Sequence, residues 1–160
     1  MHISFAVFAD AANLSQEGKL NVLGIFDALH VSGFPSMHPR AHFVVRVKGS
    51  AADSGTHRLA FHWVNPRDAE LWTSSGDLAV EAGPTAALEM DLPIIAVVDL
   101  PLDSSGQYTM RVELDGEPVA RATVFVNGPS TGALPYSTSP VMVSEASRRA
   151  ATPREASSGD

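Results

Sequence analysis

The chain has 160 residues, enough for one domain with its own hydrophobic core, and it contains no cysteine, which excludes disulfides, thiolate metal sites and a cysteine nucleophile. Its formal net charge is −7 and its 11 basic residues are scattered, so nucleic-acid binding is disfavoured, because phosphate backbones are bound by clustered lysine and arginine. No run of about 18 apolar residues is present, so the sequence predicts no membrane partner, and the absence of cysteine favours a cytoplasmic location.

The N-terminal residues predict a β-strand. In residues 3–9 every second side chain is strongly apolar, at Ile3, Phe5 and Val7, which is the period of a strand with one buried face. The core of a secretory signal is disfavoured, because no positively charged segment precedes these residues and Asp10 interrupts them.

Residues 19–31 carry apolar side chains on both faces. This pattern predicts a central strand that is covered on both sides, with a bulge or bend at Gly24. A helix is the alternative, and the β-branched and aromatic residues and the internal glycine disfavour it. Residues 32–39 are predicted to be a turn-rich connection, because Pro35 and Pro39 block ladder pairing.

Alternation predicts two further strands, which are separated by a loop at residues 49–55. Their apolar faces consist of Phe43, Val45 and Val47 within residues 42–48 and of Leu59, Phe61 and Trp63 within residues 56–64. The middle of the chain gives shorter strand candidates at 70–73, 78–81 and 86–92. Residues 94–100 form an apolar run between two prolines and are predicted to be a buried strand.

The strongest local prediction is a β-hairpin near the end of the domain. Residues 108–115 alternate between apolar and polar side chains, Asp115–Gly116 is a two-residue turn signal, and residues 118–127 return. Short alternating strands with a turn signal about every 8–12 residues predict an all-β domain over residues 1–127. We expect an antiparallel β-sandwich of the immunoglobulin-like or C2-like type.

The composition changes after Asn127. Residues 128–160 are rich in Ser, Thr, Pro, Ala and Gly, and they contain a single aromatic residue, Tyr136. Such a segment buries too little apolar area to offset the entropy of ordering the chain. We therefore predict a disordered C-terminal tail over residues 128–160.

Several short motifs of the N-terminal half form a signature. They are Ala9–Asp10, then Gly18-Lys19-Leu20-Asn21 and Gly24-Ile25-Phe26-Asp27, and finally Phe34–Pro35. With Gly106-Gln107-Tyr108 and the Asp115–Gly116 turn, this signature resembles a family of small uncharacterised bacterial domains over roughly residues 3–127. The resemblance implies a β-sandwich and carries no function, because sandwiches host many unrelated functions.

The sequence contains no recognisable catalytic, metal or cofactor motif. His38 and His42 have i,i+4 spacing, which presents two ligands together only on a helix, and Pro39 lies between them. A G-x-S-x-G elbow and a phosphate-binding glycine loop do not occur. Two carboxylate pairs, Glu89–Asp91 and Glu113–Asp115, are assigned to the polar faces of strands. We therefore predict no catalytic residue, no metal site and no cofactor.

Three residues are candidates for binding a partner: Phe34, Met37 and Trp72. Phe34 and Met37 lie in the proline-bounded connection, and Trp72 precedes a predicted turn. Aromatic and methionine side chains on the loops of a rigid scaffold are common in binding sites. The alternative is that each of them covers an open end of the core.

The sequence alone does not determine a function. The best-supported interpretation is a non-enzymatic protein-binding or assembly module, which presents loops or an exposed sheet edge to an unknown protein partner or to itself. Two alternatives stay open. One is a small ligand-binding domain or hydrolase-type enzyme with a site between loops, and the other is a structural component of a phage-like or secretion-like particle.

Overall fold

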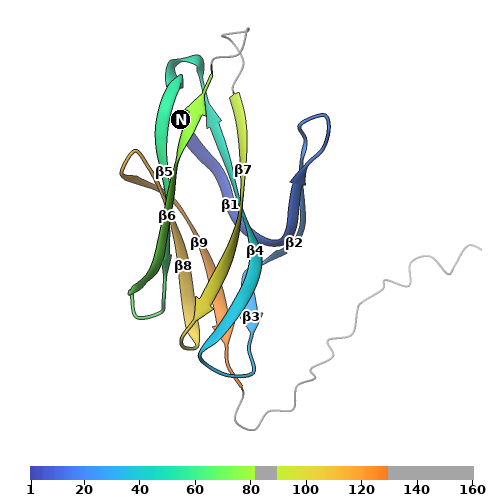
Figure 1. Ribbon diagram of the computed structural model, residues 1–160, viewed down its shortest axis with the longest axis vertical. Coiled ribbons are helices and arrows are strands. Elements are labelled where there is room, and N and C mark those ends of the chain that lie inside the picture. Colours follow the sequence, from blue (N-terminus) through green and yellow to red (C-terminus); the bar gives the residue numbers. More distant parts are fainter. Residues whose placement is uncertain (82–89, 130–160) are drawn as a thin grey trace, which may run out of the picture. The chain divides into compact units, whose positions relative to one another are not determined.

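Figure 1 shows the computed structural model, which describes residues 1–81 and 90–129. The strands are β1 (His2–Leu14), β2 (Leu20–Phe26), β3 (Ala28–His30), β4 (Ser36–Gly49), β5 (Gly55–Val64), β6 (Glu70–Val80), β7 (Met90–Leu102), β8 (Gly106–Leu114) and β9 (Glu117–Asn127). A single-turn 3-10 helix, Ala51–Asp53, joins β4 to β5. Sheet A has the order β2-β1-β4-β7, and sheet B has the order β3-β9-β8-β5-β6. All paired strands are antiparallel except β3 and β9, so the predicted all-β sandwich is confirmed.

The core between the sheets is built from the predicted alternating side chains. Phe43, Val45 and Val47 of β4 and Leu59, Phe61 and Trp63 of β5 all belong to the same buried cluster. The Trp63 ring stacks on Tyr108 with 5.3 Å between ring centroids. Its indole N–H donates a 3.1 Å hydrogen bond to the carbonyl of Pro101, so a core side chain of sheet B is anchored to an edge strand of sheet A.

The predicted hairpin is confirmed as β8 and β9. Its two turn residues, Asp115 and Gly116, have φ angles of 54° and 83°. A type I′ turn requires positive φ at both central positions, and its twist matches that of the flanking strands. The Asp115–Gly116 pair therefore fixes the register next to the turn, at Leu114–Glu117 and Glu113–Pro118, and beyond these pairs the register shifts between Val112 and Glu113.

The prediction of a central strand at residues 19–31 is wrong. The segment divides into β2, which is an edge strand of sheet A, and the short β3, which pairs with β9 in sheet B. On β2 the side chains of Leu23 and Ile25 are 72% and 63% exposed. Apolar residues on both faces predict burial on both sides, but in the structure the face with Leu23 and Ile25 is open to solvent. The predicted irregularity at Gly24 is present as a positive φ of 68°.

Three prolines that were expected to interrupt pairing, Pro39, Pro93 and Pro101, lie inside strands. β4 begins at Ser36 and runs through Pro39, where its register with β7 shifts between His38 and Ala41. β7 runs through Pro93 and Pro101, because an edge strand has a free side on which the missing N–H costs no ladder bond. The predicted buried strand at 94–100 is therefore a half-buried edge strand.

The two short candidates at 70–73 and 78–81 form one continuous strand, β6. Trp72 consequently lies inside a strand and does not precede a turn. Of the candidate strand 86–92, residues 86–89 lie outside the described residues, and so do residues 130–160, for which disorder stays a prediction. Among the described residues, no helix is long and apolar enough to cross a membrane.

Candidate functional site

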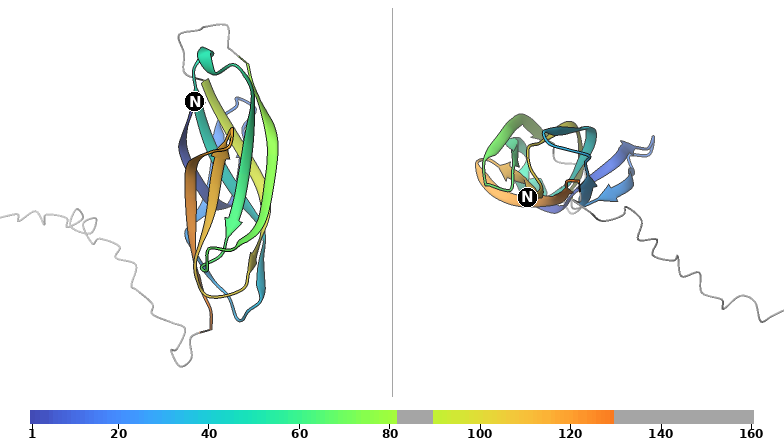
Figure 2. Two further views of the ribbon diagram at one scale, coloured as in Figure 1. Left: turned by 90° about the vertical axis from the view of Figure 1, so that its left-hand side faces the viewer. Right: turned by 90° about the horizontal axis from the view of Figure 1, so that it is seen from below.

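The second half of β1 leaves the two-layered body and forms an arm with β2 (Figures 1 and 2). β1 pairs with β4 from His2 to Ala9 and with β2 from Phe8 to Leu14, so from Ala11 onward β2 is its single partner. We call residues 10–25 the β1–β2 arm. One face of β2 exposes Leu23 and Ile25, the other face carries the half-buried Leu20 and Val22, and the outer edge of β2 has no neighbouring strand.

Local sequence explains why the arm holds its shape. At its tip, Ser15 N–H donates a 2.8 Å hydrogen bond to the carbonyl of Lys19, and Gly18 takes the positive φ that the turn requires. At its base, Gly24 has a φ of 68° and lies against the carboxylate of Asp10. A Cβ added at Gly24 would lie 2.2 Å from Asp10 Oδ2, so only glycine fits there.

Part of the outer face of sheet A is apolar, and beside it on the same face lie Arg46 and Lys48 of β4 and Asp91 of β7. One cross-strand row consists of Ile25, Ala9, His42 and Val97, and the next row consists of Val7, Val44 and Ile95. These side chains alternate with core residues of their strands, and they do not belong to the buried cluster between the sheets. Ile25 and Val97, at the two ends of the first row, are 63% and 50% exposed. Ala9 and Val44, in the middle of these rows, are fully buried, so the apolar surface is open to solvent at Ile25 and Val97, the two ends of the first row.

Three of the four edge strands carry features that oppose pairing with another chain. β3 has three residues, β6 contains Glu70 and Asp77, and β7 contains Pro93 and Pro101. Short length, charge and proline are the usual devices that protect a sheet edge. The fourth edge, β2, has the sequence LNVLGIF and contains neither a charged residue nor a proline.

A groove of about 500 Å³ separates the arm from the outer face of sheet A. Leu20 and Val22 line it from the arm, and Phe5 and Pro93 line it from the body. Arg46 and Asp91 also line the groove and form an ion pair, with 2.9 Å between Nε and Oδ1. Lys19 at the tip of the arm lines the groove as well, so the lining is mixed, with apolar walls and charged side chains.

The structure places the three predicted partner residues on different elements. Phe34 precedes a cis proline in the β3–β4 connection, is half-buried against the core, and lies against Gly128. Trp72 pairs with Trp63 across β5 and β6 and is also half-buried against the core. Met37 on β4 is 54% exposed. Partner binding by these residues stays a prediction, and the more exposed apolar residues Leu23 and Ile25 were not singled out.

The titratable side chains that form networks tie turns and strands together. The Met1 ammonium donates a 2.8 Å hydrogen bond to Asp53 and, with hydrogen bonds from Ser50, lowers the pKa of Asp53 to about 2. His57 bridges Asp115 and the carbonyl of Asp53, and the bond to Asp115 raises the pKa of His57. His62 contacts Glu70, with 2.8 Å between Nδ1 and Oε2.

The most densely bonded carboxylate is Asp103, in the β7–β8 turn. It accepts hydrogen bonds from Tyr108, Asn65 and Ser104, and it pairs with Arg67 at 2.7 Å. These donors, led by the Tyr108 hydroxyl, hold the pKa of Asp103 far below its usual value. A carboxylate stabilised in this way is a weak base, so the arrangement favours a structural role.

His38 and His42, the two histidines with i,i+4 spacing, lie in different surroundings. His38 packs edge-on against Phe26, and His42 lies on the outer face of sheet A. Within residues 1–81 and 90–129, no three acidic or histidine side chains gather in a way that could hold a metal ion. In the carboxylate pairs, Asp115 binds His57, and Glu89 lies outside the described residues.

Comparison with known proteins agrees with the resemblance found in the sequence. No curated protein matches the chain. A family model matches residues 4–127, which include the whole of the described sandwich from β2 to β9. The chain therefore belongs to the family of unknown function DUF6941.

Proposed function

We propose that this domain is a non-enzymatic protein-recognition module, which pairs the free edge of β2 with an extended apolar segment of a partner protein. The observation that carries this proposal is the edge itself, seven uncharged residues without proline at the end of sheet A. Unpaired strand edges are templates for another chain, and proteins protect the edges that they do not use. The other three edges of this sandwich are protected.

The backbone of β2 supplies the hydrogen bonds for such pairing. In an antiparallel ladder, hydrogen-bonded and non-hydrogen-bonded pairs alternate. Ser15 and Lys19 form a hydrogen-bonded pair, and the register continues without a shift to Ala11–Leu23, so every second pair from there is hydrogen-bonded. Leu20 and Val22 belong to the pairs in between, and their N–H groups therefore point away from β1. An added strand would accept from these groups, as in other cases of strand addition.

Side chains beside this edge define the chemistry of the partner. Leu23 and Ile25 lie on one face of the arm and are largely exposed, whereas β2 offers no charge to pair with. The net charge of −7 further disfavours an acidic partner. We therefore expect a segment that is extended, uncharged and apolar at alternate positions. Assembly into a phage-like or secretion-like particle would be one use of the same pairing.

Site-specific photo-crosslinking in the native cell tests the proposal. Benzoylphenylalanine replaces Leu23 in one variant, and in the control it replaces Phe125, which is 53% exposed on β9 of sheet B. We expect a discrete crosslinked product from position 23 and none of that mass from position 125. A product of twice the chain mass would identify the partner as a second copy.

A backbone variant separates strand pairing from mere proximity. Val22→Pro removes an N–H that points away from β1, so the arm keeps its internal ladder while the edge loses a donor. We expect this substitution to abolish the product at position 23 without changing the circular-dichroism spectrum or the melting temperature by more than about 3 °C. Persistence of the product in a folded Val22→Pro variant, or equal products at positions 23 and 125, would refute the proposal.

A further inference from the structure

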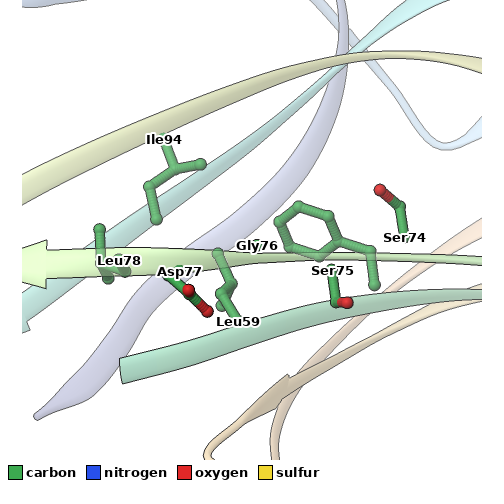
Figure 3. A pocket seen from close by; sticks show the side chains of 8 residues that line it. Leu59, Ser74, Ser75, Gly76, Asp77, Leu78 and Ile94 are labelled. Atoms are coloured by element: carbon green, nitrogen blue, oxygen red, sulfur yellow. The ribbon is translucent and has the colours of Figure 1, made fainter. Parts of the chain in front are cut away.

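A second hollow opens at the opposite edge of sheet A, where β7 meets β6, the edge strand of sheet B. We call it the seam pocket, and its volume is about 270 Å³. In Figure 3, Ile94 extends from β7 toward Leu59 and Gly76 on the facing sheet. Its apolar lining consists of Leu59, Phe61, Gly76, Leu78 and Ile94, and its polar lining consists of Ser74, Ser75 and Asp77.

The hollow arises from the small residues on the inward face of β6. Trp72, Ser74 and Gly76 pair directly with Trp63, Phe61 and Leu59, which are core residues of β5. Because directly paired residues share one face of a sheet, all three residues lie on the inward face of β6, where Gly76 contributes no side chain. Trp72 fills its position, but Ser74 and Gly76 do not fill theirs. A Cβ added at Gly76 would meet nothing within 4 Å.

Two of the three polar lining residues already have a partner. Ser75 and Asp77 alternate with the inward residues of β6, and both bind Arg58, at 2.6 Å and 3.1 Å. They therefore satisfy one another on the outer side of the strand. The interior offers aliphatic and aromatic carbon together with the Ser74 hydroxyl, so a charged ligand would lose its hydration without compensation.

We infer that the seam pocket binds a small, uncharged, apolar molecule, about the size of a bicyclic aromatic. A dry cavity of roughly 150 Å³ lined by Leu, Ile and Phe already accommodates benzene, so this larger pocket can take a second ring. The pocket opens to solvent between two edge strands, which gives such a molecule a way in. One polar N–H or hydroxyl on the ligand could bond to Ser74.

Titration with indole, followed by NMR of the methyl groups of Leu59, Leu78 and Ile94, tests this inference. In the wild-type chain we expect saturable shifts of these methyl signals. Gly76→Leu should fill the pocket, weaken indole binding at least tenfold and raise the melting temperature. Ala79→Leu adds the same side chain to the outward face of β6 and should leave binding unchanged.

A second variant that fills the seam pocket provides a test in case Gly76→Leu does not fold. Ser74→Val also points into the pocket and should weaken binding in the same direction. Absence of saturable shifts in the wild-type chain would overturn the inference, as would equal affinity in the wild-type, Gly76→Leu and Ser74→Val chains. The photo-crosslinking at position 23 reports on the opposite edge of sheet A, so neither result depends on the other.

Discussion

Removal of the Tyr108 hydroxyl should destabilise the fold far more than the loss of one oxygen suggests. This hydroxyl donates a 2.7 Å hydrogen bond to Asp103 Oδ1. It also accepts hydrogen bonds from the backbone N–H groups of Asp103 and Ser104, at 2.8 Å and 3.0 Å. The tyrosine thereby closes the β7–β8 turn, which connects sheet A to sheet B. Tyr108→Phe keeps the ring stacked on Trp63 and deletes all three bonds.

The size of the effect follows from these bonds. A neutral hydrogen bond contributes about 1 kcal/mol net, and one to a charged group about 1.5–3 kcal/mol. Two neutral bonds and one charged bond therefore total about 3.5–5 kcal/mol, and water that reaches this part-buried turn recovers some of that. We expect Tyr108→Phe to lower the free energy of unfolding by about 2–4 kcal/mol at pH 7. Thr109→Val, which removes the hydroxyl of the next residue along β8, should cost less than about 1 kcal/mol.

Urea denaturation of both variants between pH 2 and pH 7 measures the effect and its pH dependence. The pKa of Asp103 in the fold lies below its unfolded value, chiefly because of the Tyr108 hydrogen bond. Its stabilisation is therefore present above the unfolded pKa, near pH 4, and is lost as the pH falls through the folded pKa. The difference between wild type and Tyr108→Phe should be greatest at pH 7 and shrink below pH 4. A difference below about 1 kcal/mol at pH 7, or one that is constant with pH, would refute this reasoning.

Two further predictions concern Gly24 in the β1–β2 arm and the pair that His57 of β5 forms with Asp115. Gly24→Ala should cost at least about 1–2 kcal/mol, because alanine is strained at a φ of 68° and its Cβ would overlap Asp10. Hydrogen exchange should speed up in β2 but not in β5, and equal acceleration in both strands would contradict a local role for Gly24. His57 gains its raised pKa mainly from Asp115, so its contribution to stability is full below about pH 6.5 and is lost as the pH rises through the folded pKa. The melting temperature should therefore fall more between pH 6 and pH 8 in the wild-type chain than in Asp115→Asn, and parallel curves would count against the His57–Asp115 pair.

The parts of the fold that local sequence specifies were predictable. Alternation at Phe43, Val45 and Val47 depends on neighbours along one strand, and the Asp115–Gly116 turn needs two residues with positive φ. Both signals are complete within a dozen residues. Sheet order is a different kind of information, because it depends on which distant strands meet, and no local pattern contains it.

The wrong predictions arise because sheet order cannot be derived from a local pattern. Residues 19–31 have apolar side chains on both faces, and this pattern fits a central strand and also an edge strand with one open face. Pro93 and Pro101 are compatible with a strand at the edge of a sheet, and β7 is such a strand, whereas Pro39 in the interior strand β4 lies where the register shifts. The composition of β2 therefore contained the signal for the exposed edge, but only its position in sheet A shows that Leu23 faces solvent. The seam pocket could not be predicted from the sequence, because Gly76 leaves a hollow only where it pairs with the core residue Leu59.

The two proposed sites follow from one property of this sandwich, which is that both of its sheets have open edges. In a closed barrel every strand is paired, and neither an added strand nor a seam between edge strands can exist. In sheet A, β1 and β4 lie between β2 and β7, and the free edge of β2 has no residue in common with the lining of the seam pocket, so the two sites can differ in chemistry. At the β2 edge, the strand has no charged residue and Leu23 is exposed. At the β7 edge, Pro93 and Pro101 oppose pairing with another strand, and the seam pocket beside Gly76 has room for a small molecule. A single substitution at either edge should therefore abolish one activity and spare the other.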